Sequence, residues 1–157
     1  MNRDIILNQT FVAIDPSCAS QSSKPGYAIY QAGKFVEGGV IDVKYKPSLP
    51  FRLQSIRELI AREIAPHVQM LVIEDVPVRP IKTASGIQMN FQAISSLKMA
   101  CGATIAAFGI GVPVIQMPAN LWTRLAHNAG IVWEKSDDKD AQLIGWATIQ
   151  LAQSGDE

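Results

Sequence analysis

The chain has 157 residues, of which 48% are hydrophobic and 18% are charged. This composition supplies a full apolar core and excludes a disordered or low-complexity chain, and the length fits one domain over residues 1–157. The 14 basic and 14 acidic side chains balance to zero, which taken alone argues against a nucleic-acid binder.

Three features of the sequence indicate a cytoplasmic protein. No run of about 18 apolar residues occurs, so neither a transmembrane helix nor a membrane partner is expected. The opening MNRDIILNQT places Asp4 in a very short apolar patch, unlike a secretory signal. Cys18 and Cys101 lack metal-ligand spacing and are expected to be reduced thiols.

The first half of the chain predicts a three-strand meander followed by a βα unit. Residues 10–15 form an apolar strand, and a hairpin over 26–43 turns near Gly33 after a loop rich in Ser, Gly and Pro. Apolar residues recur at helical spacing over 48–66, and MLVIE at 70–74 is the next strand.

The second half predicts further alternation of helices and strands. A long helix over 87–108 is rich in small residues, and a strand follows at 111–117. A short helix over 118–130 ends at Gly130, and Ser136 is a natural N-cap for a last helix over 136–153. The whole order predicts an α/β fold with a mixed five-stranded sheet, the meander plus βα units, flanked by helices on both faces.

Two of the predicted strands end on a carboxylate. FVAIDPS runs from four apolar residues into Asp15, and MLVIEDVP runs into Glu74 before Pro77. An unpaired buried carboxylate is costly, so each acid calls for a base, a hydrogen-bond network or a metal ion as its partner.

The last predicted helix adds two more acids. Asp137 and Asp140 lie on the same stripe as the core-facing residues, whereas Asp138 points elsewhere. Acids in a first turn also complement the helix dipole, so this helix alone fits solvated capping residues equally well. Counted with Asp15 and Glu74, however, three separate elements carry acids on apolar faces.

Four carboxylates without a nearby His–Cys set favour a hard cation such as Mg²⁺ or Mn²⁺. Two such ions about 4 Å apart can activate a water and stabilise the leaving oxygen of a phosphodiester. The pattern therefore favours phosphodiester hydrolysis.

Four stretches, taken in order, resemble the RuvC-type Holliday junction resolvases, a family within the RNase H-like superfamily of nucleases. They span most of the chain, from about residue 11 to residue 152. The stretches are AIDPSCASQSSKPGYAIY, VIEDVPV, SSLKMACGATIAAFGIGVPVIQMPANLWT and SDDKDAQLIGWA.

The resemblance implies an RNase H-like fold in which Asp15, Glu74, Asp137 and Asp140 are catalytic and bind two Mg²⁺ or Mn²⁺ ions. Asp138 replaces Asp137 in this set if the helix starts one residue later. The resemblance also implies a homodimer that cuts symmetric strands of a four-way DNA junction, with the helix over 87–108 as the dimer surface. A branch-migration complex is an additional partner that the sequence leaves open.

DNA contacts are expected from basic residues near the proposed site. Arg79, Lys82 and Arg124 are candidates for holding phosphates, with solvated loop charges as the competing interpretation for the first two. The span from 44 to 98 holds eight basic residues against four acidic ones. If divalent ions neutralise part of the acidic set, the zero net charge hides a basic surface.

One departure from the family pattern concerns the aromatic residue that inserts at the junction centre, because Pro77 stands at that position. Phe91 is a candidate substitute, although a core aromatic on a helix is the simpler interpretation. The departure suggests a divergent member of the family, such as a phage-encoded one, with a broader substrate range.

Three alternatives stay open at this point. One is another RNase H-like nuclease that cuts flapped DNA or RNA–DNA hybrids, and a second is a relative that binds branched DNA without cutting it. A sugar-kinase or actin-like relative shares a similar sheet, but its second domain hardly fits in 157 residues.

Overall fold

The computed structural model describes residues 3–44, 47–76, 81–83, 86–88 and 90–155, with the backbone alone at 81–83, 87 and 88. Pro77 and Arg79, for which the sequence predicts roles, lie outside this part of the chain. Within it, no helix combines the length and hydrophobicity needed to cross a bilayer.

A mixed five-stranded sheet forms the centre of the fold, as predicted. Its strand order is β3-β2-β1-β4-β7, in which β1 pairs antiparallel with β2 and parallel with β4. The pairing of β2 with β3 is antiparallel and that of β4 with β7 is parallel. The strands are β1 (Thr10–Asp15), β2 (Gly26–Gln31), β3 (Lys34–Val40), β4 (Met70–Asp75) and β7 (Val114–Pro118).

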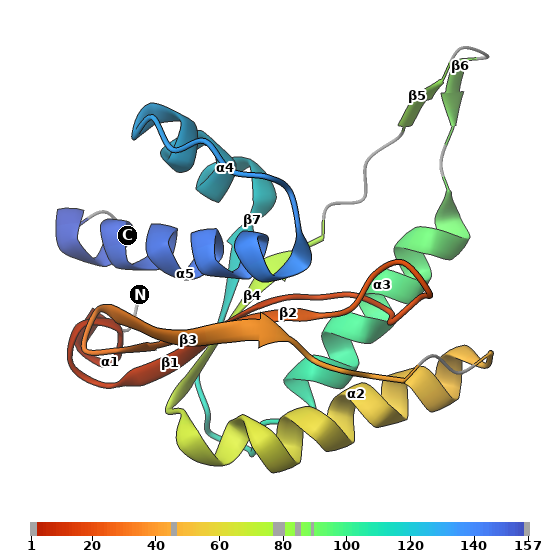
Figure 1. Ribbon diagram of the computed structural model, residues 1–157, viewed down its shortest axis with the longest axis horizontal. Coiled ribbons are helices and arrows are strands. Elements are labelled where there is room, and N and C mark those ends of the chain that lie inside the picture. The colour runs from red at the N-terminus through yellow and green to blue at the C-terminus, as the bar shows by residue number, and fades with distance from the viewer. Residues whose placement is uncertain (1–2, 45–46, 77–80, 84–85, 89, 156–157) are drawn as a thin grey trace.

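Helices cover both faces of this sheet (Figure 1). One face carries α1 (Arg3–Asn8), α4 (Ala119–Asn128) and α5 (Asp137–Ser154), and its core includes Phe11 and Ile144. The other face carries α2 (Leu49–Glu63) and α3 (Phe91–Ile105), and its core includes Ile14, Ile60 and Phe108. A short 3₁₀ helix, η1 (Ala65–His67), leads from α2 into β4.

The structure corrects the segment between β4 and α3. The helix expected from residue 87 begins at Phe91, where the Asn90 side chain accepts a hydrogen bond of 3.0 Å from the Ala93 amide. The residues before it form a hairpin of β5 (Ile81–Thr83) and β6 (Gly86–Gln88), which projects away from the main sheet (Figure 1). Helix α1 was also not predicted.

Phe91 is not the core aromatic that the simpler interpretation expected. Its side chain is 70% exposed at the start of α3. Phe91 is the first residue of α3, whereas the buried residues of this helix, Ala100, Cys101 and Thr104, all lie in its second half.

Helix α5 lies close against β2 because a glycine removes the side chain that would separate them. A Cβ at Gly145 would lie 2.2 Å from the Tyr30 ring, which stacks on Phe11 with centroids 5.1 Å apart. The Tyr30 hydroxyl donates a 2.7 Å hydrogen bond to the carbonyl of Gln142. These contacts fix α5 on the sheet both along its axis and about it.

Gly145→Ala is expected to lower the free energy of unfolding by about 1–3 kcal/mol, because the tightly packed Tyr30 ring must move. Gly39→Ala is the matched control, since its Cβ would make an ordinary 3.6 Å contact with the Tyr27 ring. The control should stay within about 0.5 kcal/mol of wild type in urea unfolding. Equal losses in the two variants would contradict this packing.

Candidate active site

The alternation of side chains along β1 decides which face Asp15 occupies. Phe11 and Ala13 pack into the core under α5, whereas Val12 and Ile14 pack into the core on the α2 and α3 side. Successive strand residues point to opposite faces, so Asp15 follows Phe11 and Ala13 toward α5.

The same alternation applies to the neighbouring strand β4. Met70 and Val72 pack under α5, which places Glu74 on that face beside Asp15. Asp75 faces the other side, where its carboxylate lies 3.2 Å from the ammonium of Lys98 on α3. Parallel pairing of β1 with β4 brings the two strand-end acids to the same edge of the sheet.

A second glycine lets the start of α5 reach these strand ends. A Cβ at Gly26 would lie 1.9 Å from the Asp137 carbonyl oxygen, so only glycine fits between the start of β2 and the first turn of α5. The backbone amide of Lys24 donates a 3.0 Å hydrogen bond to Asp137 Oδ2. The β1–β2 loop thus holds the first acid of the helix.

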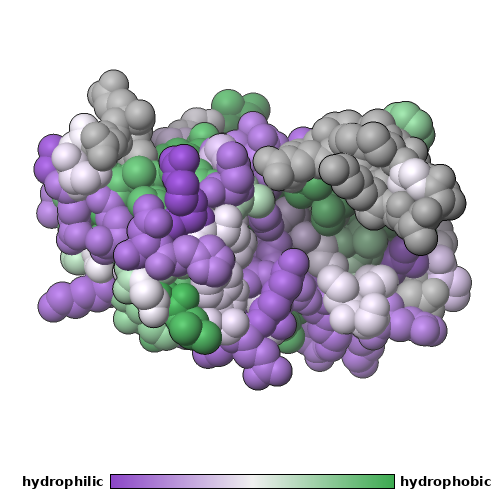
Figure 2. All heavy atoms as spheres, turned by 90° about the horizontal axis from the view of Figure 1, so that it is seen from above, coloured by the Kyte–Doolittle hydropathy of each residue, from purple (hydrophilic) through white to green (hydrophobic). Residues whose placement is uncertain are grey.

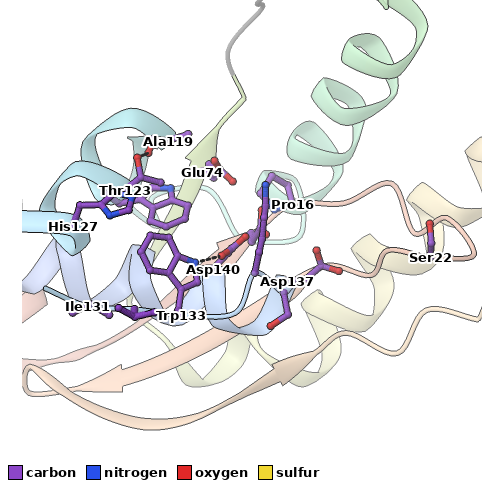
Figure 3. Close-up of a pocket in the computed structure, with 15 residues that line it drawn as sticks. Pro16, Ser22, Glu74, Ala119, Thr123, His127, Ile131, Trp133, Asp137 and Asp140 are labelled. Atoms are coloured by element: carbon purple, nitrogen blue, oxygen red, sulfur yellow. Dashed lines mark hydrogen bonds between the residues drawn. The ribbon is translucent and has the colours of Figure 1, made fainter. Parts of the chain in front are cut away.

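All four predicted acids line one cavity of about 840 Å³. Figure 3 shows Glu74 at the end of β4 and Asp140 and Asp137 on the first turns of α5. Asp138 does not line this cavity and instead accepts a 2.9 Å hydrogen bond from Ser136 Oγ. The other lining residues are Pro16, Ser22, Ala119, Trp122, Thr123, His127, Ile131, Val132, Trp133, Lys135 and Ser136.

The convergence of acids changes their proton affinities. Burial is the main cause that raises the pKa of Asp15 to about 9, and a hydrogen bond with Glu74 and the charges of Glu74, Asp140 and Asp137 raise it further. Burial also raises the pKa of Glu74, and the nearby donor groups of Asp15 and Trp122 oppose that rise. The strand-end pair therefore shares a proton near neutral pH.

Burial likewise raises the pKa of Asp140, which is only 4% exposed. The Trp133 indole and the Lys135 ammonium oppose that rise. Trp133 Nε1 donates a 3.1 Å hydrogen bond to Asp140 Oδ1, drawn as a dashed line in Figure 3. The Trp133 ring also contacts the rings of Trp122 and His127, with centroid separations of 5.8 and 5.4 Å.

The donor set fits a hard divalent cation, because it consists of carboxylate oxygens from three separate elements. In the described part of the chain, no three His, Cys, Asp or Glu side chains already stand in a ligand arrangement. Binding would therefore draw these side chains together and displace the proton shared by Asp15 and Glu74.

The structure describes the three predicted DNA-contacting residues only in part. Arg124 is exposed on α4 and does not line the cavity, although its neighbour Thr123 does. Only the backbone of Lys82 is described, in β5, and Arg79 lies outside the described residues.

Sequence reasoning missed Lys135, Trp133 and Trp122 as residues of the cavity. Lys135 directly precedes the N-cap of an acidic helix, and this position was the available signal for a cation beside the acids. An indole donor shows no periodicity in the sequence, so no pattern marks the two tryptophans as residues of a site.

Comparison of the chain with models of protein families gave no match, and comparison with curated proteins gave none either.

The raised pKa of Asp15 predicts a pH-dependent stability. Between about pH 4 and pH 9 the folded chain holds a proton that the unfolded chain has released, so the free energy of unfolding falls as pH rises. Asp15→Asn has no such proton to hold, so its free energy of unfolding does not fall in this way as pH rises. It should be more stable than wild type at pH 8 by at least about 1 kcal/mol. Near pH 4 the two proteins should be about equal.

Urea unfolding in EDTA at both pH values measures this difference, with Asp138→Asn as the control because Asp138 lies outside the cavity. The control should follow wild type at each pH. An Asp15→Asn protein that is less stable than wild type at pH 8 would show that Asp15 does not carry the stored proton.

Proposed function

We propose that the chain is a metal-dependent endonuclease that cuts branched DNA, with an RNase H-like fold and a RuvC-type mode of action on four-way junctions. The observation that carries the proposal is the meeting of Asp15, Glu74, Asp137 and Asp140 in one cavity at the ends of β1, β4 and α5. The three-strand meander joined to parallel βα units is the architecture that the resemblance implies.

The four acids would hold two Mg²⁺ or Mn²⁺ ions, which when bound activate a water and stabilise the leaving oxygen of the phosphodiester. The chain itself supplies the arrangement around that chemistry. Gly26 and the Lys24 amide fix Asp137, and burial between the sheet and α5 limits the freedom of Asp140. Lys135 is the one lysine or arginine among the described residues that line the cavity, and it is available for a phosphate oxygen.

DNA is proposed to approach the end of the molecule that carries α4 and the β5–β6 hairpin. Figure 2 shows this end, where hydrophilic side chains cover most of the described surface around smaller apolar areas. Arg124 on α4 is exposed and adjacent in sequence to the cavity-lining Thr123, so it is a candidate for a phosphate contact beyond the cavity.

A cleavage panel tests the proposal on a four-way junction, a flap, a duplex and an RNA–DNA hybrid, each in Mg²⁺ and in EDTA. Wild type should cut the junction only with Mg²⁺. Asp15→Asn should cut at least about 100-fold more slowly while still binding the junction, because a site carboxylate is lost. Asp138→Asn should stay within about twofold of wild type, since it lies outside the cavity.

The outcomes separate the alternatives. Cleavage by Asp15→Asn at the wild-type rate would refute the site. Cleavage of the hybrid or flap in preference to the junction would favour another RNase H-like nuclease, and junction binding without any cleavage would favour a non-cleaving relative.

We further propose a homodimer that uses the solvent-facing side of α3. Ser95, Met99, Gly102 and Ala106 follow one another at helical spacing, and all four are exposed. Met99 is 48% exposed, and a Cβ at Gly102 would meet nothing within 4 Å, so another backbone could approach closely. A two-fold pair of such faces would suit a two-fold junction.

Met99→Asp is expected to convert the dimer to a monomer, because a charge would be buried at the centre of this face. Sedimentation velocity at micromolar concentration measures the change, and circular dichroism confirms the fold. A Met99→Asp protein that still sediments as a dimer would place the interface elsewhere, and a monomeric wild type would refute the homodimer.

A further inference from the structure

We propose that Trp133 and Trp122 are positioning residues, whose indole N–H groups orient Asp140 and Glu74 toward bound divalent cations. This inference rests on the proposed metal-dependent function and adds to it which protein groups set the ligand geometry. It assigns the tryptophans a role other than filling the core.

The first observation is that one carboxylate oxygen of Asp140 already accepts a hydrogen bond. Trp133 Nε1 donates to Asp140 Oδ1 at 3.1 Å, and no described residue donates a hydrogen bond to Oδ2. A carboxylate held in this way offers one oxygen to a cation at a fixed orientation. Partners of this kind behind metal ligands commonly change metal affinity 10- to 100-fold when removed.

The second observation is a donor without an acceptor. Trp122 is 4% exposed, and its Nε1 has no hydrogen-bond partner of normal geometry among the described residues. The same indole is close enough to Glu74 to lower the pKa of that carboxyl, as a hydrogen-bond donor would. A small movement of Glu74 on cation binding would complete the bond, and a buried orphan donor favours that movement.

The third observation is the rigidity of the donors. The Trp133 ring contacts two rings of α4, those of Trp122 and His127. The segment that joins α4 to α5 and carries Trp133 is fastened by a 3.0 Å hydrogen bond from the Ile131 amide to the Ala126 carbonyl. These ring contacts limit the directions in which the Trp133 indole can present its N–H. The donors are thus set before a cation arrives.

The indoles also differ from a cationic partner in their effect on charge. A lysine or arginine that paired with Asp140 would cancel the negative charge that attracts a divalent ion. An indole N–H fixes the carboxylate and leaves its full charge. No ion pair of the four cavity acids occurs within the described residues, in agreement with this division of roles.

The test measures Mn²⁺ binding without DNA, by the electron paramagnetic resonance signal of the free ion. Trp133→Phe keeps an aromatic ring and removes the donor, and we expect its dissociation constant to rise about 10-fold. Trp122→Phe should also weaken binding. Trp146→Phe is the matched control, because Trp146 is half-buried on α5 but outside the cavity, and it should bind as wild type does.

Thermal unfolding in EDTA separates a positioning role from a packing role. A Trp133→Phe protein with a lower melting temperature but the wild-type dissociation constant would overturn the inference. If Trp133→Phe does not fold, site-specific 3-benzothienylalanine at position 133 replaces the N–H by sulfur within a ring of the same shape, and the same 10-fold loss is expected of it.

The design also distinguishes failure of the inference from failure of the proposed function. If wild type binds Mn²⁺ and cuts DNA while the position-133 variants bind equally well, only the positioning role fails. If wild type binds no Mn²⁺ at millimolar concentration, the metal-dependent function fails with it.

Discussion

The close approach of α5 to β2 is the constraint on which the candidate site depends. Gly26 lies against the backbone of Asp137, and Gly145 lies against the ring of Tyr30, so the helix is held at two points along its length. Consecutive helical residues are about 100° apart around the axis, so a slip of one residue would turn Asp140 away from the cavity. The acids of α5 meet those of β1 and β4 only because two side chains are absent.

This geometry concentrates like charges on partly or fully buried side chains, and the surrounding groups offset only part of the electrostatic cost. The N-terminus of α5 attracts negative charge, and the Lys24 amide and Trp133 indole each hold one carboxylate oxygen. The raised pKa of Asp15 shows that the balance is still unfavourable to four ionised acids. Either a proton or a cation must therefore complete the cluster, and the two compete for the same oxygens.

The sequence predicts those parts of the site that depend on local pattern. An apolar strand that ends in an acid fixes Asp15 and Glu74 on one face, because alternation needs no knowledge of the fold. The stripe of α5 likewise predicts a buried Asp140. The β5–β6 hairpin was missed because apolar residues continue from 87 into α3, and they extended the helix past the Asn90 cap. Trp133 was missed because its hydrogen bond depends on how the α4–α5 segment folds back, which periodicity does not encode.

The contacts of Asp75, Asp137 and Asp140 show two ways of holding a carboxylate. Asp75, on the opposite face of β4, forms an ion pair with Lys98, and its charge is thereby cancelled. Asp137 and Asp140 are instead held by a backbone amide and an indole, which direct the carboxylates but carry no net charge. Acids on opposite sides of the sheet thus have different kinds of partner. Such neutral donors are what a cation site requires, because they fix geometry while the negative potential of the cavity remains available.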